Sequence, residues 1–156
     1  MCGIGAILDL RFERVPYLRP ALAGMNELQA HRGPDGEGTW LHPREHVGFA
    51  HRRLKIIGLE RGDQPMTDGE GNWITYNGEI YNYLELRREL GEGTFTTDSD
   101  TEVILRAYRR YGIDCLRRLR GMFAFALWDE KARRLVVCRD RFGIKPLHYT
   151  VADGVL

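Results

Sequence analysis

The chain begins Met1-Cys2-Gly3-Ile4-Gly5, with a cysteine directly after the initiator methionine. A second residue as small as cysteine allows Met1 to be removed. Removal would leave Cys2 with a thiol and a free α-amino group, whose reference pKa values are about 8.5 and about 7.7–8.0. One residue could then supply both a nucleophile and its base. The alternative is that Cys2 is only a small residue that leads into a strand.

Length and composition indicate a single folded domain. The 156 residues are enough to bury a core, and a hydrophobic fraction of 43% argues against wholesale disorder. The net charge is +1, from 23 basic and 22 acidic residues, so charge does not point to a polyanionic partner. No apolar run reaches the roughly 18–20 residues of a membrane span, and no signal-peptide pattern is visible. We therefore expect neither nucleic acid nor a membrane as a partner.

The three cysteines, Cys2, Cys115 and Cys138, form neither a disulfide framework nor a metal-binding pattern. Their number is odd and their spacings are wide, whereas both kinds of site use paired, closely spaced cysteines. Cys115 and Cys138 have the character of ordinary buried thiols. The sequence therefore predicts no metal site in this domain and a reducing, cytoplasmic setting.

The hydrophobic pattern of the first half predicts strands around one helix. Apolar residues near a 3.6-residue period indicate the helix, and short apolar runs indicate strands. His31-Arg32-Gly33-Pro34-Asp35-Gly36 should be a loop. Asn77-Gly78 is a strong turn signal that should end the strand before it. The expected elements are a strand at 4–8, a helix at 17–30, two strands within 46–57 and a short strand at 73–76.

The second half predicts two helices and then strands. Residues 80–90 carry a helical stripe that stops at Gly91, and Ser99-Asp100-Thr101-Glu102 fits a capping box before a helix that Gly112 closes. Because strands and helices do not alternate regularly, the pattern favours an α+β fold with packed sheets. Residues 154–156 look like a turn into one more strand, so we expect a longer protein. The remaining expected elements are strands at 122–128, 134–139 and 147–151, and a loop at 140–146.

An N-terminal thiol suggests acyl transfer, which needs a nucleophile, a base and donors for the developing oxyanion. Cys2 could supply the first two. Asn77-Gly78 could supply the donors, through a side-chain amide and a backbone N–H. The alternative for Asn77-Gly78 is a hairpin turn without a catalytic role.

An amino-acid substrate would need a cation for its carboxylate and an acid for its ammonium group. Arg53 is a candidate for the first role, because a guanidinium binds a carboxylate through two parallel hydrogen bonds. Asp100 is a candidate for the second. The alternatives are a surface arginine on an edge strand, and a carboxylate that only stabilises the first turn of a helix.

The order of several sequence blocks carries a family resemblance. The blocks are Met1-Cys2-Gly3-Ile4, His31-Arg32-Gly33-Pro34-Asp35-Gly36, Arg53-Leu54-Lys55-Ile56, Gln64-Pro65-Met66, Tyr76-Asn77-Gly78-Glu79-Ile80-Tyr81-Asn82, Ser99-Asp100-Thr101-Glu102-Val103-Ile104, Gly121-Met122-Phe123-Ala124-Phe125-Ala126 and Arg139-Asp140-Arg141-Phe142-Gly143-Ile144-Lys145-Pro146-Leu147. In this order they resemble the N-terminal glutaminase domain of glutamine-dependent asparagine synthetases, which are class II glutamine amidotransferases. The resemblance covers nearly the whole chain.

The resemblance implies an N-terminal-nucleophile hydrolase fold, with four α/β/β/α layers and two stacked antiparallel sheets. It also implies that Cys2 is the nucleophile once Met1 is removed, with its own α-amino group as the base, acting through a water. Asn77 and Gly78 match the oxyanion-hole pair. The matches to substrate-binding positions are Arg53 for the α-carboxylate, Glu79 and Asp100 for the amino end, and Leu54 and Ile56 for backbone contacts. We expect the loop residues His31, Arg32 and Asp35 to shape the site rather than to catalyse.

By the same resemblance, the domain would hydrolyse L-glutamine to glutamate and ammonia through a γ-glutamyl thioester. The ammonia would pass to a C-terminal synthetase domain and attack β-aspartyl-AMP to form asparagine. That domain's Ser-Gly-Gly-x-Asp-Ser loop does not occur in this sequence. We therefore expect residues 1–156 to be a glutamine amidotransferase type 2 domain, cut before its last strands, that needs no cofactor. ATP and Mg²⁺ would serve only the absent domain, and a homodimer is compatible with this interpretation.

Three other functions stay open. An asparagine-synthetase-like enzyme could amidate another carboxylate in a peptide or polysaccharide pathway, and the glutaminase half says little about that acceptor. A non-catalytic domain could bind an amino acid or a partner, although the presence of Cys2, Asn77 and Arg53 argues against it. A self-processing amide hydrolase of the same fold could take another substrate, which the matches at Arg53 and Asp100 disfavour.

Overall fold

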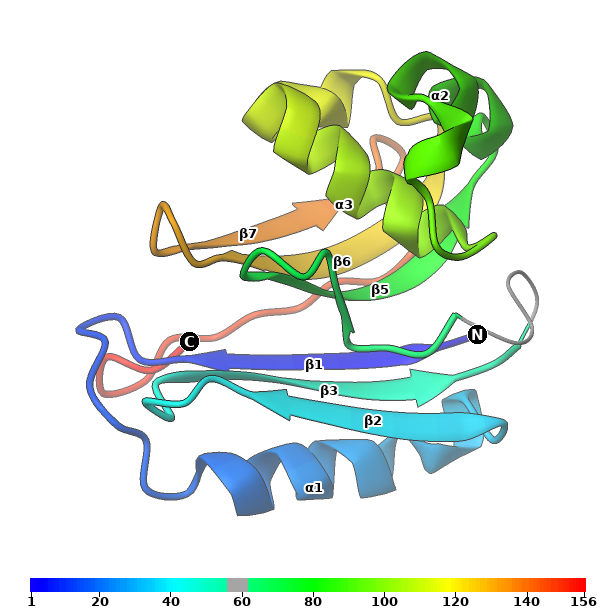
Figure 1. The fold of residues 1–156 in the computed structure, drawn as a ribbon. Helices are drawn as coiled ribbons and strands as arrows, with labels where there is room; N and C mark the ends of the chain where they lie inside the picture. Colours follow the sequence, from blue (N-terminus) through cyan, green and yellow to red (C-terminus); the bar gives the residue numbers. More distant parts are fainter. Residues whose placement is uncertain (56–61) are drawn as a thin grey trace.

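The computed structural model describes residues 1–55 and 62–156, which form two antiparallel sheets stacked face to face (Figure 1). The strands are β1 (Gly3–Leu8), β2 (Gly36–Leu41), β3 (Val47–Arg53), β4 (Met66–Thr67), β5 (Asn72–Ile80), β6 (Gly121–Asp129) and β7 (Arg134–Arg139). The first sheet has the order β1-β3-β2, and the second has the order β4-β5-β6-β7.

Helices cover the outer face of each sheet, so the layers run helix, sheet, sheet, helix (Figure 1). α1 (Leu18–Leu28) packs on the first sheet, while α2 (Tyr83–Leu90) and α3 (Asp100–Tyr111) lie over the second. Short 3₁₀ turns are η1 (Ala30–Arg32), η2 (Glu92–Thr94) and η3 (Gly112–Arg117). No helix within the described residues is both long and apolar enough to span a membrane. The predicted α+β class and the two packed sheets are confirmed.

Alternation along the strands sends neighbouring side chains into different layers. Ile7 packs with Leu22 of α1, whereas Leu8 packs with Trp128 between the two sheets. A third core, which includes Ile104 of α3, lies between the second sheet and its helices. Burial on both faces explains why residues 123–128 of β6 are all buried and all apolar.

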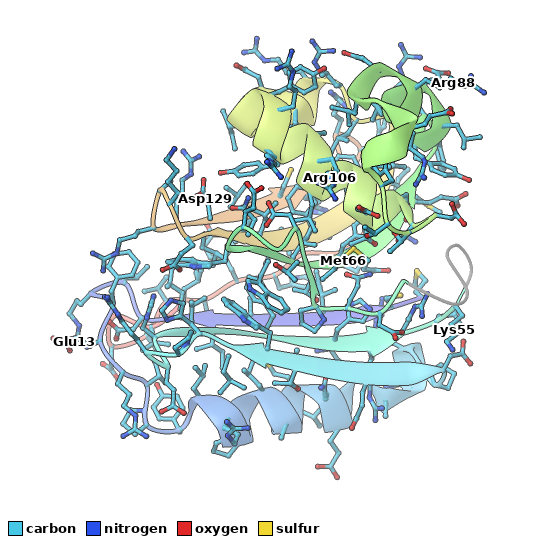
Figure 2. All side chains as sticks on the ribbon, viewed as in Figure 1. Glu13, Lys55, Met66, Arg88, Arg106 and Asp129 are labelled. Atoms are coloured by element: carbon cyan, nitrogen blue, oxygen red, sulfur yellow. The ribbon has the colours of Figure 1, made fainter. Side chains whose placement is uncertain are left out.

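The start of β1 and the end of β3 meet at one end of the first sheet, because Gly3 pairs with Arg52 in the antiparallel register. We call this the Cys2 end. Figure 2 shows Lys55 at this end and Glu13 at the opposite end of the molecule. The two sheets contact one another through β1 and β3 of the first sheet and β5 and β6 of the second. Cys2, which precedes Gly3, and Arg53, which follows Arg52, therefore lie at the same end, next to the second sheet.

The prediction of a turn at Asn77-Gly78 is wrong. β5 runs through both residues and pairs with β6 as far as Ile80, which lies opposite Gly121. A turn signal is local, and here nine consecutive cross-strand pairs outweigh it. The glycine serves close packing instead, because a Cβ on Gly78 would lie 2.3 Å from the carbonyl oxygen of Met122.

The expected strand at 147–151 is also wrong. These residues form no strand, and most of them are exposed. Pairing begins only near the last residues, where Leu156 and Leu8 exchange two backbone hydrogen bonds of 2.8 and 3.0 Å. Strand propensity alone does not form a strand without a neighbour for its backbone groups.

Other elements match with adjusted bounds. The helix expected at 17–30 is α1, and the helix after Ser99 is α3, which ends before Gly112 as predicted. The described part of 46–57 holds one strand, β3, rather than two. β2 was not predicted, because Gly36 and Gly38 weaken its strand signal and its pairing with β3 supplies what the local sequence lacks.

The capping box is half formed. The Ser99 hydroxyl accepts a hydrogen bond from the Thr101 backbone N–H at 3.1 Å, as a helix cap should. The Glu102 carboxylate does not return to the Ser99 N–H. It accepts hydrogen bonds from the backbone N–H groups of Thr96 and Thr97 at 3.0 and 2.7 Å. Glu102 therefore anchors the loop that leads into α3.

Candidate active site

A small cavity of about 70 Å³ lies at the Cys2 end, lined by both sheets and by the first turn of α3. It brings together seven of the eight residues that the sequence proposed for the site. Those seven are Cys2, Arg53, Leu54, Asn77, Gly78, Glu79 and Asp100. The eighth, Ile56, lies outside the described residues.

Cys2 precedes β1, and its thiol is held by the backbone of Leu54. The Leu54 N–H donates to the Cys2 Sγ at 3.4 Å, and the Sγ lies 3.7 Å from the Leu54 carbonyl oxygen. The Arg32 guanidinium donates to the Cys2 carbonyl oxygen at 3.3 Å. These contacts fix both the side chain and the backbone of Cys2 against the end of β3.

The loop before β2 shapes this corner. The Asp35 carboxylate accepts a hydrogen bond from the Lys55 N–H at 2.9 Å, and the Asp35 N–H donates to the Arg53 carbonyl oxygen at 3.0 Å. Gly33 lies so close to β3 that a Cβ would sit 2.4 Å from the carbonyl carbon of Arg52. Arg32 and Asp35 thus support the residues of the cavity through backbone contacts.

Asn77 and Gly78 reach the cavity from β5 in the second sheet. Asn77 is buried, and the two residues pair with Ala124 and Phe123 of β6. The strand places a side-chain amide and a glycine backbone side by side, facing a thiol from the other sheet. Such groups are donors suited to a developing oxyanion.

Arg53 is buried with 5% of its surface exposed, although it carries a charge. Its guanidinium donates to the Asp63 carboxylate at 2.7 Å. The Asp63 side chain is 86% exposed, so solvent competes for this ion pair. The Asp63 side of this ion pair is therefore open to solvent, while the Arg53 side is buried.

Asp100 begins α3 and is joined to β5. Its carboxylate accepts hydrogen bonds from the Tyr76 hydroxyl at 2.7 Å and from the Ile80 N–H at 3.0 Å. Burial raises the pKa of Asp100 above its ordinary value, and these two bonds oppose part of the rise. Burial together with the neighbouring Asp100 raises the pKa of Tyr76 well above its ordinary value.

The cavity carries charges of both signs. Arg53 of the first sheet and Lys145 of the loop after β7 are cationic, whereas Glu79 and Asp100 contribute acidic groups from the second sheet and α3. This arrangement complements a zwitterionic amino acid. Within residues 1–55 and 62–156, no group of three or more His, Cys, Asp or Glu side chains is placed to hold a metal ion.

Several residues that also line the cavity were not among the predicted site residues. They are Met1, Gly62, Gln64, Tyr76, Ser99, Thr101, Met122 and Lys145. Gln64 clamps the backbone of β5, because its side-chain amide donates to the Tyr76 carbonyl oxygen and accepts from the Tyr76 N–H, at 3.2 and 2.7 Å. Its place in the Gln64-Pro65-Met66 block was the sequence feature that could have pointed to a role in the site.

Lys145 reaches the cavity from the loop after β7. Asp140 holds this loop, because its carboxylate accepts the Lys145 N–H at 3.0 Å and the Ile144 N–H at 2.9 Å. The Lys145 ammonium lies 3.4 Å from the Sδ of Met1. The initiator methionine therefore occupies the rim of the cavity beside Cys2.

Comparison with known proteins gives the family. A family model described as a glutamine amidotransferase domain matches residues 1–156. Asparagine synthetase [glutamine-hydrolyzing] 1 of Bacillus subtilis (strain 168) is 49% identical over 98% of this chain and 24% of its own length. A putative asparagine synthetase [glutamine-hydrolyzing] 2 of Methanocaldococcus jannaschii is 39% identical over 96% of this chain and 32% of its own length.

One similar protein carries a different name. Amidase chry2 of Gibberella zeae is 43% identical over 100% of this chain and 25% of its own length. The chain thus spans a quarter to a third of the length of these relatives. It belongs to the glutamine amidotransferase domain family, in the class II group that includes the glutaminase domains of glutamine-hydrolysing asparagine synthetases.

Proposed function

We propose that this domain hydrolyses the side-chain amide of L-glutamine to glutamate and ammonia, with Cys2 as the nucleophile after Met1 is removed. One observation carries the proposal: the thiol of Cys2, the Asn77-Gly78 pair and the Arg53 guanidinium line the same cavity although they come from distant parts of the chain. The family and the two stacked sheets support an N-terminal-nucleophile hydrolase fold for the domain.

The charges of the cavity orient the substrate in this proposal. Arg53 binds the α-carboxylate of glutamine in place of Asp63, and Glu79 and Asp100 bind its ammonium group. The backbone of Leu54, and by resemblance that of Ile56, adds polar contacts. The side-chain amide of glutamine then extends toward Cys2, between the two sheets.

The reaction proceeds by acyl transfer. The free α-amino group of Cys2 takes the thiol proton through a water, and the thiolate attacks the amide carbon of glutamine. The Asn77 amide and the Gly78 N–H stabilise the tetrahedral oxyanion, a role worth about 3–4 kcal/mol for one donor in comparable sites. The α-ammonium returns its proton to the leaving nitrogen, and ammonia departs. Water then hydrolyses the γ-glutamyl thioester to glutamate and regenerates the thiol.

The fate of the ammonia is proposed from the relatives. The names of the asparagine synthetases favour a C-terminal synthetase domain as the partner and aspartate as the acceptor, with ATP and Mg²⁺ acting in that domain. The similarity to amidase chry2 favours a second candidate, in which a carboxylate of another kind is amidated. The free thiols of Cys2, Cys115 and Cys138 suit a reducing compartment such as the cytoplasm.

The test is glutamate release from L-glutamine by the whole chain. Cys2→Ala should abolish release, whereas Cys138→Ala should leave it intact, because Cys138 does not line the cavity. Mass spectrometry should show that the active fraction equals the fraction that lacks Met1. Full activity in Cys2→Ala, or in protein that retains Met1, would contradict the proposal.

A further inference from the structure

A buried polar pair joins the two sheets directly behind the cavity. His51 of β3 is 1% exposed and Thr75 of β5 is 0% exposed. The His51 Nδ1 lies 3.1 Å from the Thr75 Oγ1, and the Thr75 hydroxyl donates to the Ala50 carbonyl oxygen at 3.1 Å. Most of the surrounding layer is apolar, with Phe49 and Trp128 in its core.

The protons of this pair are determined by its partners. A carbonyl oxygen only accepts, so the single hydroxyl hydrogen of Thr75 points to Ala50. The Thr75 Oγ1 must then accept the Nδ1–H of His51. The Nε2 of His51 carries the lone pair, and it is buried without a hydrogen-bond partner among the described residues. Burial, together with the nearby Arg53, lowers the pKa of His51 to about 3, so the ring stays neutral near pH 7.

His51 and Thr75 each precede a residue of the candidate site by two positions on the same strand. Arg53 follows His51 by two positions on β3, and Asn77 follows Thr75 by two positions on β5. Side chains two positions apart on a strand share a face. The hydrogen bond therefore links the two strands immediately next to the place where Arg53 and Asn77 enter the cavity. An apolar contact allows small sliding of one sheet on another, whereas a directed hydrogen bond fixes separation and register.

We propose that the His51–Thr75 hydrogen bond is a positioning contact that sets the distance between Arg53 and Asn77 across the cavity. This inference rests on the proposed function. Arg53 anchors the substrate carboxylate from the first sheet, while Asn77 receives the oxyanion on the second. Asp100 moves with Asn77, because its carboxylate is bonded to Tyr76 and Ile80 of β5. A change in sheet separation thus moves Asn77 and Asp100 relative to Arg53 and to the Cys2 thiol, which Leu54 holds at the end of β3.

A first experiment changes the hydroxyl. Thr75→Val keeps the shape of the side chain but removes its hydrogen bonds to His51 and to Ala50, and Thr75→Ser keeps the hydroxyl. In the whole chain, with Met1 removed, Thr75→Val should lower kcat/KM for L-glutamine by about tenfold or more, because small misplacements of reacting groups are costly. Thr75→Ser should stay within about twofold of the wild type.

A second experiment changes the ring. The side-chain amide of asparagine places an N–H near the position of Nδ1, and that of glutamine places it near the position of Nε2. His51→Asn should therefore retain more activity than His51→Gln, although glutamine is closer to histidine in size. The opposite order would overturn the role of the Nδ1–H bond.

A third measurement separates positioning from stability. L-glutaminol has an alcohol in place of the carboxylate of glutamine, so it does not use Arg53 as an anion anchor. The loss caused by Thr75→Val should be smaller with this substrate than with L-glutamine, because only the alignment of Cys2 with Asn77 then depends on the separation of the sheets. If Thr75→Val only lowers the melting temperature and its folded fraction keeps the wild-type kcat and KM, the pair is merely structural and the inference fails.

The outcomes also distinguish a failure of this inference from a failure of the proposed glutamine hydrolysis. No glutamate release by wild-type protein with a free Cys2 would overturn the proposed function, and the positioning role with it. Wild-type activity combined with equal kcat/KM values for Thr75→Val and Thr75→Ser would overturn the positioning role alone.

Discussion

The Tyr76 hydroxyl donates a 2.7 Å hydrogen bond to the Asp100 carboxylate, and so joins β5 to the first turn of α3. The bond couples two elements that both line the cavity. It also opposes the rise that burial imposes on the pKa of Asp100. The charge of Asp100 therefore depends on its hydrogen bond with Tyr76 of the neighbouring strand.

Tyr76→Phe should move the acidic limb of the kcat/KM profile for glutamine to higher pH. Loss of the hydroxyl removes a bond that lowers the pKa of Asp100, so the carboxyl group becomes protonated at a higher pH and binds the substrate ammonium less well. The measurement is kcat/KM against pH. Tyr108→Phe is the matched control, because Tyr108 donates to Asp129 away from the cavity. Equal profiles for the two variants would contradict the prediction.

Asp100→Asn should bind glutamine poorly and yet unfold at a higher temperature near pH 7. The pKa of Asp100 is raised in the folded state, so ionisation of this carboxyl group destabilises the fold above its ordinary pKa of 3.8. The neutral amide accepts from Tyr76 without that cost. We expect a higher melting temperature at pH 7, with the difference vanishing below about pH 3.8. A lower melting temperature at neutral pH would refute the reasoning.

Glu102→Gln should destabilise the protein at neutral pH by about 1–3 kcal/mol. Although burial raises the pKa of Glu102, its hydrogen bonds with Thr96, Thr97 and Arg106 lower it below the ordinary value of 4.5. A lowered pKa in the folded state gives stability above about pH 4.5, which is lost as the pH falls through the folded value. Urea unfolding at pH 7 and at pH 3 should therefore show the deficit of the variant shrinking at the lower pH.

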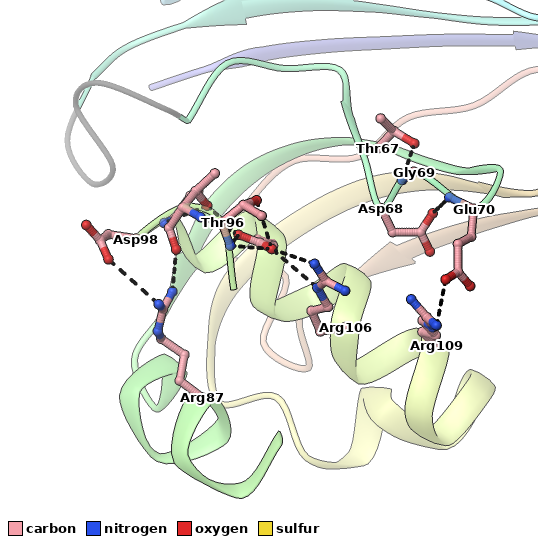
Figure 3. Close-up of polar contacts among 12 residues, drawn as sticks. Thr67, Asp68, Gly69, Glu70, Arg87, Thr96, Asp98, Arg106 and Arg109 are labelled. Carbon is pink, nitrogen blue, oxygen red and sulfur yellow. Dashed lines mark hydrogen bonds and ion pairs between the residues drawn. The ribbon is translucent and has the colours of Figure 1, made fainter. Parts of the chain in front are cut away.

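The control for this prediction lies in the same loop. Figure 3 shows Thr96 and Arg106 bonded to one carboxylate, that of Glu102, and shows Asp98 paired with Arg87. The Asp98 side chain is 97% exposed, and its oxygen lies 3.7 Å from the Arg87 nitrogen. Asp98→Asn should change the unfolding free energy by less than about 0.5 kcal/mol. A deficit in Asp98→Asn as large as that in Glu102→Gln would mean that charge near the loop, rather than the buried bonds, is responsible.

Gly78→Ala should be damaging, whereas Gly24→Ala should be harmless. A Cβ at position 78 meets the backbone of β6, with the Met122 oxygen at 2.3 Å and the Phe123 Cα at 2.7 Å. The strands must separate, at a cost of about 1–3 kcal/mol, and the donors at Asn77-Gly78 move with them. A Cβ at Gly24 in α1 meets nothing within 4 Å, so alanine should stabilise the helix by about 0.5–1 kcal/mol. Unfolding curves and glutamate release measure both effects.

Much of the fold could be predicted from local patterns. β7 has the bounds expected from its apolar run, and α3 lies between the signals at Ser99 and Gly112. These elements were predictable because their periodicity reflects burial on one side or both. β2 and the path of β5 through Asn77-Gly78 depend on pairing with strands distant in the sequence, which no local window contains.

Part of the candidate site could likewise be predicted from the sequence. The side chains of Cys2, Arg53 and Asn77 suit a nucleophile, a carboxylate partner and an oxyanion donor, so a search for such groups proposes them. Gln64 and Lys145 line the cavity because two separate loops bring them there. Neither side chain has a chemical property that marks it as a site residue in the sequence. The His51–Thr75 bond crosses between the two sheets, so it can be identified only when the positions of β3 and β5 are known.

The thiol of Cys2 is held by Leu54 and its carbonyl oxygen by Arg32 while Met1 is still attached. The scaffold of the site is thus assembled before the base exists. On the proposed mechanism, the chain is a zymogen whose inhibitory segment is a single residue. Its activation is then the hydrolysis of one peptide bond, between Met1 and Cys2, in a site whose hydrogen bonds from Leu54 and Arg32 are already formed.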